Sequence, residues 1–468
     1  MTLWLGASEV AARTKSVMKT TLRSGAGRIH FLLRAWRPIS SHTSPVDSSD
    51  IISAVSPKTL QKGGDNGNFK QDFMKLKQPR SSVTTVLQSG NSEAQRTSIT
   101  KLRRVVKKLC KSKRFERALE ALMLMETQNK IRMSPADHAL RLELTIKVHG
   151  LLKAEEHFNQ LPNIASQKAS SLLLLHGYVK EKNTEKAEAF MAKLKGLGLV
   201  VDPHLYNEMM KLYVATSQNE KVPLVIKDMK QNHILRNVLS YNLWMNACSE
   251  LYGVRSVELV YEEMLSDKNV QVGWSTLSTL AKVYTQAGLV HKAFAALKAA
   301  EKKLSSGNRL GYFFLITLYA TLNDKEGVLR VWTASKAVSD RPTCANYMCI
   351  LLCLVKLGDI NEAEKIFKEW ELDCRNYDIR VSNVLLGAYV RNGLLEKAES
   401  LHMHTLERGG TPNYKTWEIL MEGCVRSQNL DRGSNNVEEN KIHTSMTVHV
   451  QALQEHQGEP EHISRNYE

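Results

Sequence analysis

The chain has 468 residues, of which 43% are hydrophobic and only 7% aromatic, and it carries a formal net charge of +16. This length is ample for one long domain with a sizeable core. No uninterrupted apolar stretch approaches the roughly 18 residues that a membrane-spanning helix needs, so we expect no membrane insertion. The basic charge favours a polyanionic partner or a negatively polarised compartment.

The first segment, residues 1–46, is rich in Arg, Ser and Thr and holds a single acid, Glu9. Its seven Lys and Arg residues give it a net charge of +6, and short apolar patches alternate with the arginines. This pattern is typical of an organelle-import presequence. We predict a mitochondrial transit peptide, with plastid import as the alternative.

Two further segments precede the regular part of the chain. Residues 47–98 are rich in Ser, Gly, Asn and Lys with few large apolar groups, which predicts a disordered linker. A dense basic stretch, KLRRVVKKLCKSKRFER, follows at 101–117. Two interpretations of it stay open, phosphate binding and a solvated helix face.

A period of about 35 residues runs through most of the remaining chain. Two series of positions keep it, one centred on tyrosine and one set by a small or β-branched residue. The first series is Tyr178, Tyr213, Cys248, Tyr284, Tyr319, Leu354, Tyr389 and Cys424. The second is Ala118, Ala154, Ala187, Val222, Val257, Ala293, Val328, Ala363 and Ala398. Such regularity predicts a solenoid of short repeats.

The unit from Asp202 to Asn237 indicates what one repeat contains. Pro203 opens an apolar run at helical spacing, and a second run places Val222 and Ile226 on one stripe. Each repeat is therefore predicted to be two antiparallel helices, which must stack on their neighbours to bury a core. The tyrosines are expected to be core residues. After Asn429 the pattern stops, so residues 428–468 are expected to be an irregular tail.

Sequence signals for catalysis or metal binding are missing. The seven cysteines form no CxxC pair, and no second pair or histidine set completes a zinc site. Neither a P-loop nor a G-x-S-x-G, H-E-x-x-H or deaminase-type H-x-E…P-C-x-x-C motif is present. We expect no catalytic residue, no metal, no cofactor and no small-molecule substrate.

The period, the Tyr-Asn pairs at 206–207 and 241–242, and the segment NGLLEKAESLHMHTLERGGTPN at 392–413 resemble pentatricopeptide repeats. The uniform units are similar to the P-type subclass, in a family of mostly plant organellar RNA-binding proteins. The resemblance covers residues 99–427. It implies an all-α fold, a right-handed α-solenoid of about ten antiparallel helix-pair repeats.

The resemblance also implies which residues contact single-stranded RNA. In the family, the fifth residue of the first helix and the last residue of the repeat face the concave groove and contact one base. Transferred to this sequence, Asn207 with Asn237 and Asn383 with Asn413 resemble pyrimidine-reading pairs. Ser278 with Asn308 resembles an adenine-reading pair, and Asn242 with Gly273 is half a pair. The predicted RNA-binding residues are Asn207, Asn237, Asn242, Ser278, Asn308, Asn383 and Asn413.

Other fifth positions depart from the family pattern, since Leu172, Phe313 and Met348 cannot make an amide contact and Glu418 would repel phosphate. An apolar residue there either stacks on a base or packs against a protein partner. Two hypotheses follow. The chain binds single-stranded organellar RNA and acts in processing, stability, splicing or translation of mitochondrial transcripts. Alternatively, it is a scaffold or structural subunit of a mitochondrial ribonucleoprotein such as the ribosome, with ribosomal proteins as partners.

Overall fold

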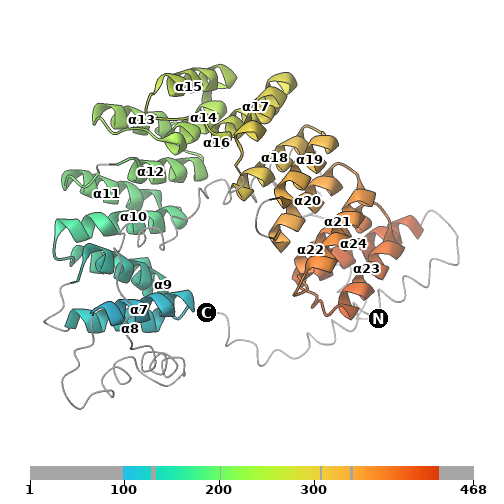
Figure 1. Cartoon of the computed structure of the whole chain (residues 1–468), viewed down its shortest axis with the longest axis horizontal. Helices are drawn as coiled ribbons and strands as arrows, with labels where there is room; N and C mark the ends of the chain where they lie inside the picture. Colours follow the sequence, from blue (N-terminus) through green and yellow to red (C-terminus); the bar gives the residue numbers. More distant parts are fainter. Residues whose placement is uncertain (1–98, 128–132, 201, 306–307, 338–340, 432–468) are drawn as a thin grey trace, which may run out of the picture. The chain divides into compact units, whose positions relative to one another are not determined.

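The computed structural model describes residues 99–431 except 128–132, 201, 306–307 and 338–340 (Figure 1). Within these residues the chain forms 18 helices, α7 to α24, and no strand. None of the described helices combines the length and the apolar character that crossing a bilayer would need. The predicted transit peptide, the predicted linker and residues 432–468 of the predicted tail lie outside the described residues.

The described residues fall into two compact units that divide between Gln218 and Asn219. The first unit holds α7 (Ile99–Lys111), α8 (Phe115–Thr127), α9 (Pro135–Asn159), α10 (Ile164–Lys180), α11 (Thr184–Gly196) and α12 (Pro203–Ala215). The second unit begins with α13 (Lys221–Gln231), α14 (Val238–Tyr252), α15 (Val254–Ser266), α16 (Trp274–Gln286), α17 (Val290–Lys303) and α18 (Arg309–Thr321). It continues with α19 (Lys325–Lys336), α20 (Cys344–Lys356), α21 (Ile360–Asp373), α22 (Ile379–Arg391), α23 (Leu395–Glu407) and α24 (Tyr414–Asp431).

Within each unit the helices form antiparallel pairs, as the repeat pattern predicts. We call the members of each pair the first and the second helix, and we label α12 and α13, which the division between the units separates, by their places in the sequence. First helices are α7, the part of α9 before Gly150, α10, α12, α14, α16, α18, α20, α22 and α24. Second helices are α8, the part of α9 after Gly150, α11, α13, α15, α17, α19, α21 and α23. Gly150 separates the two halves of α9 because its backbone leaves the helical region.

A residue with positive φ reverses the chain between the two helices of each described pair. The series is Lys113, Gly150, Lys182, Ser217, Gly253, Gly288, Asn323, Gly358 and Gly393. Left-handed backbone is open to glycine without steric cost, whereas a side chain with a Cβ is strained there. This turn position is a third periodic marker of the repeat.

First helices pack directly on one another from pair to pair. In the second unit the contacts run from α14 through α16, α18, α20 and α22 to α24, and α10 contacts α12 in the first unit. Each second helix also packs against the first helix of the next pair, as α21 does on α22. The first helices of a unit thus form a continuous layer, here called the first-helix wall. The predicted all-α solenoid of stacked helix pairs is confirmed.

The two sequence series have distinct roles in this packing. Every residue of the small series, from Ala118 to Ala398, is completely buried. The tyrosines of the periodic series are buried or half-buried, and the hydroxyls of Tyr213, Tyr284 and Tyr389 reach carboxylates on the preceding second helix. Tyr389 donates to Glu364 at 2.8 Å, and Lys397 from the next second helix contacts the same carboxylate at 2.8 Å. Tyr284, Glu258 and Lys292 repeat this arrangement at 3.1 and 2.8 Å.

These clusters, which we call Tyr–Glu–Lys clusters, tie two consecutive pairs together at three points. The lysine also lies over the ring of its tyrosine, with Lys397 Nζ 5.7 Å from the Tyr389 centroid. Burial and the bond to Glu258 raise the pKa of Tyr284 to about 12. Burial alone would raise the pKa of Glu364, but the bonds from Lys397 and Tyr389 outweigh it and the pKa is lowered. Tyr284 and Tyr389 are therefore packing residues whose hydroxyls also donate hydrogen bonds to a carboxylate of the preceding helix.

Candidate nucleic-acid interface

The predicted RNA-binding residues occupy two repeated places on the first helices. Asn207, Asn242, Ser278 and Asn383 are the fifth residues of α12, α14, α16 and α22. The predicted closing residues lie at helix starts, with Asn237 and Asn308 as the N-caps of α14 and α18. Asn413 directly precedes α24 and accepts a hydrogen bond from the Thr416 amide at 3.1 Å. A fifth residue and the N-cap of the next first helix can therefore meet within the wall.

Asn383 and Asn413 form such a contact. Asn383 Nδ2 donates to Asn413 Oδ1 at 3.2 Å, and the Thr416 hydroxyl donates to Asn383 Oδ1 at 3.0 Å. Asn413 Oδ1 is thus committed to the cap of α24 and to Asn383. These contacts use neither N–H of the Asn413 amide nitrogen. The pair has its oxygens occupied and retains N–H donors.

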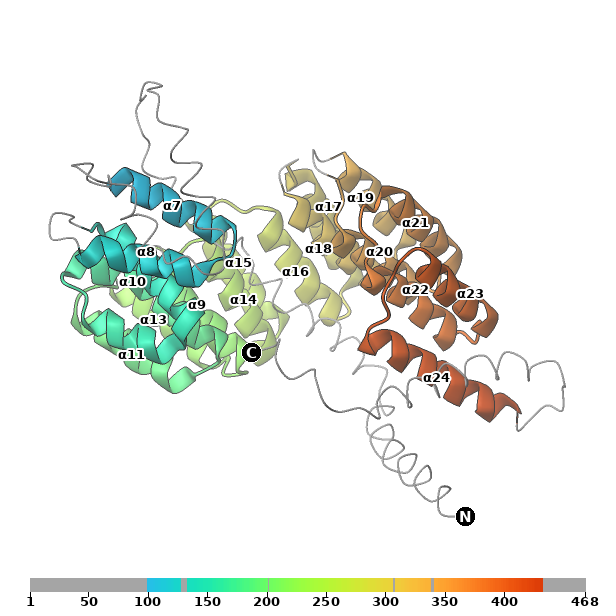
Figure 2. The same cartoon turned by 90° about the horizontal axis from the view of Figure 1, so that it is seen from below.

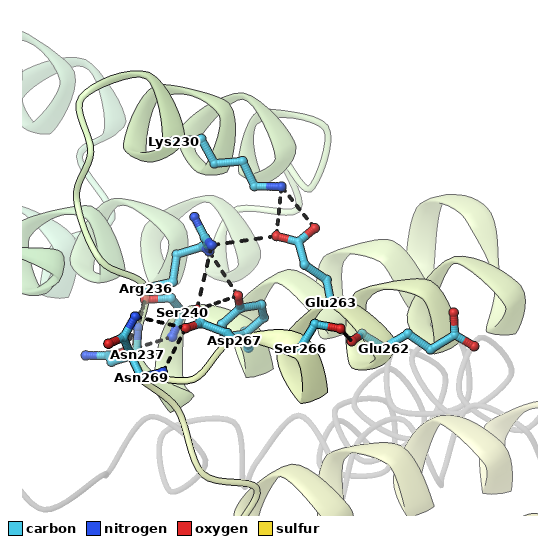
Figure 3. Close-up of polar contacts among 10 residues, drawn as sticks. Lys230, Arg236, Asn237, Ser240, Glu262, Glu263, Ser266, Asp267 and Asn269 are labelled. Carbon is cyan, nitrogen blue, oxygen red and sulfur yellow. Dashed lines mark hydrogen bonds and ion pairs between the residues drawn. The ribbon is translucent and has the colours of Figure 1, made fainter.

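Asn237 is held in a polar cluster at the start of α14 (Figure 3). Its Oδ1 accepts from the backbone N–H of Ser240 at 3.0 Å, while Ser240 Oγ accepts from the backbone N–H of Asn237 at 3.2 Å. The two bonds together form a capping box. Beside it, Arg236 Nε donates to the Tyr241 hydroxyl at 3.1 Å, and that hydroxyl donates to Asp267 at 2.9 Å. The backbone carrying Asn237 is therefore fixed by its own helix and by α15.

The predicted residues of α16 and α18 are not in direct contact in the described structure. Ser278 Oγ donates to the Trp274 carbonyl of its own helix at 2.8 Å. Asn308 Nδ2 donates to Ser305 Oγ at 2.8 Å.

Asn242 of α14 has one side-chain atom without a hydrogen-bond partner in the described part of the chain. Its Nδ2 donates to Ser275 Oγ at 3.4 Å, but among the described residues no group donates a hydrogen bond to the buried Oδ1. An amide oxygen without a partner is a ready acceptor for a ligand.

Burial of the fifth residues differs from the expectation of side chains that face an open groove. Asn207 is 1% exposed, Ser278 3% and Asn383 7%. The physical reason is the direct contact between consecutive first helices, which closes over short side chains at these positions. The more accessible members of the predicted set are the half-buried Asn237, Asn242, Asn308 and Asn413.

The fifth residues that depart from the family pattern fall into three groups. Phe313 is 4% exposed and packs beside Trp332, with ring centroids 6.3 Å apart, so it belongs to the core and is not a stacking platform. Leu172 and Met348 are half-buried. Glu418 is exposed, and Lys415 Nζ contacts its carboxylate at 2.8 Å. The apolar fifth residues therefore do not form a continuous exposed surface through Phe313, where a base or a protein partner could pack.

Three cations at one repeated position of the last first helices were not identified from the sequence. Lys356, Arg391 and Arg426 each occupy the thirteenth position of their helix, in α20, α22 and α24. Lys356 Nζ donates to Thr321 Oγ1 at 3.1 Å, and Arg426 donates to the Arg391 carbonyl at 3.3 Å. Burial lowers the pKa of Lys356. Their spacing of 35 residues was a signal available in the sequence.

The described residues offer no metal centre, because no group of three or more His, Cys, Asp or Glu side chains converges among them. The structure offers a wall of first helices with amides at several of their fifth residues and helix starts and with cations at the thirteenth residues of three of them. Stacked helix pairs of this kind define a helical-repeat protein of the α-solenoid class.

Comparison with known proteins identifies the family. The family model of the pentatricopeptide repeat domain matches residues 190–250, and the family model of the PPR repeat matches residues 172–199, 346–373 and 381–409. A pentatricopeptide repeat-containing protein of Arabidopsis thaliana is 53% identical over 388 residues, which cover 82% of this chain and 79% of that protein. The chain belongs to the pentatricopeptide repeat family.

Other similar proteins extend this picture. A pentatricopeptide repeat-containing protein of A. thaliana that is named as mitochondrial is 33% identical over 76% of this chain and 72% of its own length. The large ribosomal subunit protein mL101 of the same plant is 37% identical over 70% of this chain and 66% of its own length. Among solved structures, the maize pentatricopeptide repeat protein PPR10 shares 17% identity, with a TM-score of 0.42, over 78% of this chain and 53% of that chain.

Proposed function

We propose that this chain binds single-stranded RNA along its first-helix wall and acts in the post-transcriptional handling of mitochondrial transcripts, in processing, stability, splicing or translation. The observation that carries the proposal is the Asn383–Asn413 pair, in which two consecutive repeats bring amides together and keep N–H donors free. The chain acts by binding and not by catalysis. Its uniform 35-residue units support the P-type subclass.

The chemistry of the pair suits pyrimidines. Because the amide oxygens of Asn383 and Asn413 already accept hydrogen bonds, the groups that remain are donors. Uracil and cytosine present carbonyl acceptors on their pairing edge, and an amide N–H matches them. Asn242 offers the complementary half, an acceptor without a partner in the described structure.

Binding at buried amides requires some separation of neighbouring first helices. A solenoid permits it, because each repeat contacts only its neighbours and small rotations add along the stack. The cations at the thirteenth residues of α20, α22 and α24 add positive charge that attracts the phosphate backbone, although Arg426 also pairs with Glu422 at 2.7 Å. The proposal therefore couples base contact at the fifth residues to phosphate contact about two turns further along α20, α22 and α24.

The variant Asn413→Asp tests the proposal with little structural change. A carboxylate caps α24 as well as an amide oxygen does, but it has no N–H to donate. We expect roughly tenfold weaker binding of a pyrimidine-rich oligomer in fluorescence anisotropy, which corresponds to about 1.4 kcal/mol for one lost hydrogen bond. Asn183→Asp is the matched control, since Asn183 caps the second helix α11.

Two outcomes would contradict the proposal. One is wild-type protein that binds neither random nor pyrimidine-rich RNA at low salt. The other is equal loss of affinity in the Asn413→Asp and Asn183→Asp variants, because the effect would then come from added negative charge alone.

The mitochondrial location is part of the proposal. Its support is the Arg-rich, acid-poor segment at residues 1–46 together with relatives that are named as mitochondrial. Import of the full chain into isolated mitochondria, with cleavage near residue 46, is the expected result. Uptake by plastids alone would contradict it.

A second candidate function is a structural subunit of the mitochondrial ribosome. The observation in its favour is the 37% identity to the ribosomal protein mL101. Cosedimentation of the tagged chain with the large ribosomal subunit at high salt would favour this candidate. Sedimentation with free transcripts would favour the first.

A further inference from the structure

We infer that the first helix pair, α7–α8, is a separate site that binds the phosphate backbone of RNA without reading its sequence. This inference rests on the proposed RNA binding and adds a second contact region to it. The site is the cationic face of α7 and the turn after it, formed by Lys107, Lys111 and Lys113. In Figure 2 this pair lies at the end of the first unit.

The distribution of charge along the chain points to this pair. Residues 99–117 contain nine Lys and Arg residues and one acid, Glu116, a net charge of +8. All of residues 118–468 together contain 41 Lys and Arg and 41 Asp and Glu residues, a net charge of zero. Part of this balance comes from the acidic predicted tail, because residues 128–427 contain 38 Lys and Arg and 32 Asp and Glu residues, a net charge of +6 over 300 residues. The first pair, residues 99–127, carries the same net charge of +6 within 29 residues. The charge density of the repeat region is therefore highest in its first pair, where we expect the strongest attraction for polyanions.

The structure places this charge on an outer face. Leu102, Val105, Val106 and Leu109 form one buried stripe of α7, which packs against α8. Lys107, Lys111 and Lys113 are exposed. Arg103 instead forms an ion pair with Asp137, with Nε 3.0 Å from the carboxylate, so the negative charge of Asp137 is paired with Arg103 and not with the three lysines. Within the described residues, none of the three exposed lysines has an ion-pair partner.

Lys113 extends the cationic face beyond the end of α7. It lies in the left-handed turn between α7 and α8, with φ 58°, a turn position that holds glycine in five other repeats and lysine, serine or asparagine in three. Its exposed side chain places a third positive charge at the tip of the face that Lys107 and Lys111 form.

The chemistry of the face fits phosphates better than bases. Phe115 is the one aromatic residue in 99–117, and Lys147 already lies over its ring at 4.8 Å, so no stacking platform is available there. Lys107 and Lys111 are one helical turn apart, about 6 Å along the axis, a spacing that lets both contact one strand. Lysines acting as point charges attract phosphate regardless of base.

The test compares two triple variants of the full chain that lose the same charge. Lys107→Gln/Lys111→Gln/Lys113→Gly removes the proposed site. Lys182→Gly/Lys227→Gln/Lys298→Gln is the control, because Lys182 occupies the same kind of left-handed turn (φ 56°) and Lys227 and Lys298 are exposed on second helices. Both sets exchange lysine for good helix formers or relieve turn strain, so both variants should fold, which circular dichroism will verify.

The readout is the salt dependence of RNA binding by anisotropy between 50 and 200 mM salt. Each single-strand phosphate contact contributes about 0.7 to the log–log slope, so the α7 variant should lose about 2 in slope while the control keeps the wild-type slope. The ratio of affinities for pyrimidine-rich and purine-rich oligomers should stay unchanged in both.

Three results separate the possibilities. Equal slopes for the two triple variants would overturn the α7 site and leave the proposed function standing. A changed pyrimidine-to-purine ratio in the α7 variant would also overturn it, because the face would then read bases. Wild-type protein that binds no RNA at low salt would overturn the proposed function and this inference together.

Discussion

Removal of the Tyr389 hydroxyl tests the Tyr–Glu–Lys clusters that join consecutive repeats. Tyr389→Phe keeps the buried ring and deletes only the donor to Glu364, 2.8 Å away. A hydrogen bond to a charged group contributes about 1.5–3 kcal/mol to stability. The Glu364 side chain is 26% exposed and retains Lys397, so water replaces part of the lost contact. We therefore expect a loss near the lower limit, about 1.5 kcal/mol.

Amide hydrogen exchange followed by mass spectrometry measures this loss locally. A repeat array opens in parts, so a single global free energy of unfolding is not a suitable quantity. A loss of about 1.4 kcal/mol corresponds to tenfold faster exchange, which we expect in peptides from α22 and α23. Tyr414→Phe is the control, because Tyr414 is 85% exposed. Exchange within twofold of wild type in Tyr389→Phe would refute the reasoning.

Further predictions concern the turns, the small residues and the response to pH. Gly393→Ala should cost about 1–2 kcal/mol because φ is +73°, and the loss should appear as faster hydrogen exchange in peptides from α22 and α23. Asn323→Gly at the equivalent turn should slow exchange in peptides from α18 and α19, and equal effects of both variants would contradict the strain argument. Ala363→Leu should cost about 1–3 kcal/mol by overpacking a fully buried contact, whereas Ala345→Leu on an exposed surface should change little. The folded-state pKa of Tyr284 is raised to about 12, so its contribution is complete below the unfolded pKa near 10 and is lost as pH rises towards 12. The thermal midpoint of Tyr284→Phe should therefore fall less than that of wild type between pH 9 and pH 11.5, and parallel curves would count against this cluster.

Much of the fold follows from periodicity. The 35-residue spacing of the tyrosines predicts the helix pairs, and Pro203 with its cap Asp202 starts α12 where the sequence analysis places it. The predicted fifth residues are the fifth residues of α12, α14, α16, α18, α20, α22 and α24. Because the same 35-residue spacing recurs in every unit, the start of each helix can be predicted from several neighbouring repeats and not from its own residues alone.

The exception is α10. The helix begins at Ile164, since Asn163 Oδ1 accepts from the Ser166 amide at 2.8 Å and caps it early. Leu172, predicted as a fifth residue, is therefore the ninth residue of its helix. The start of α10 is set by the local cap at Asn163 and not by the 35-residue period. The sequence alone does not indicate which of these two signals determines the first residue of a helix.

The burial of the candidate site was not predictable either. Whether Asn383 faces a groove or a neighbour depends on how closely α22 and α24 approach, and that distance is set by side chains from two different repeats. Periodicity identifies the positions but contains no information on this approach. The same holds for Phe313, whose partner Trp332 is contributed by the following helix.

Ultraviolet crosslinking of the full chain to a pyrimidine-rich single-stranded RNA, with the crosslinked peptides identified by mass spectrometry, addresses the central claim most directly. The account predicts crosslinks in peptides from the first helices α14, α16 and α22 and from the segment that contains Asn413. Crosslinks confined to second helices such as α17 and α21 would contradict it, because the wall that carries the amides would then not be the surface that meets RNA.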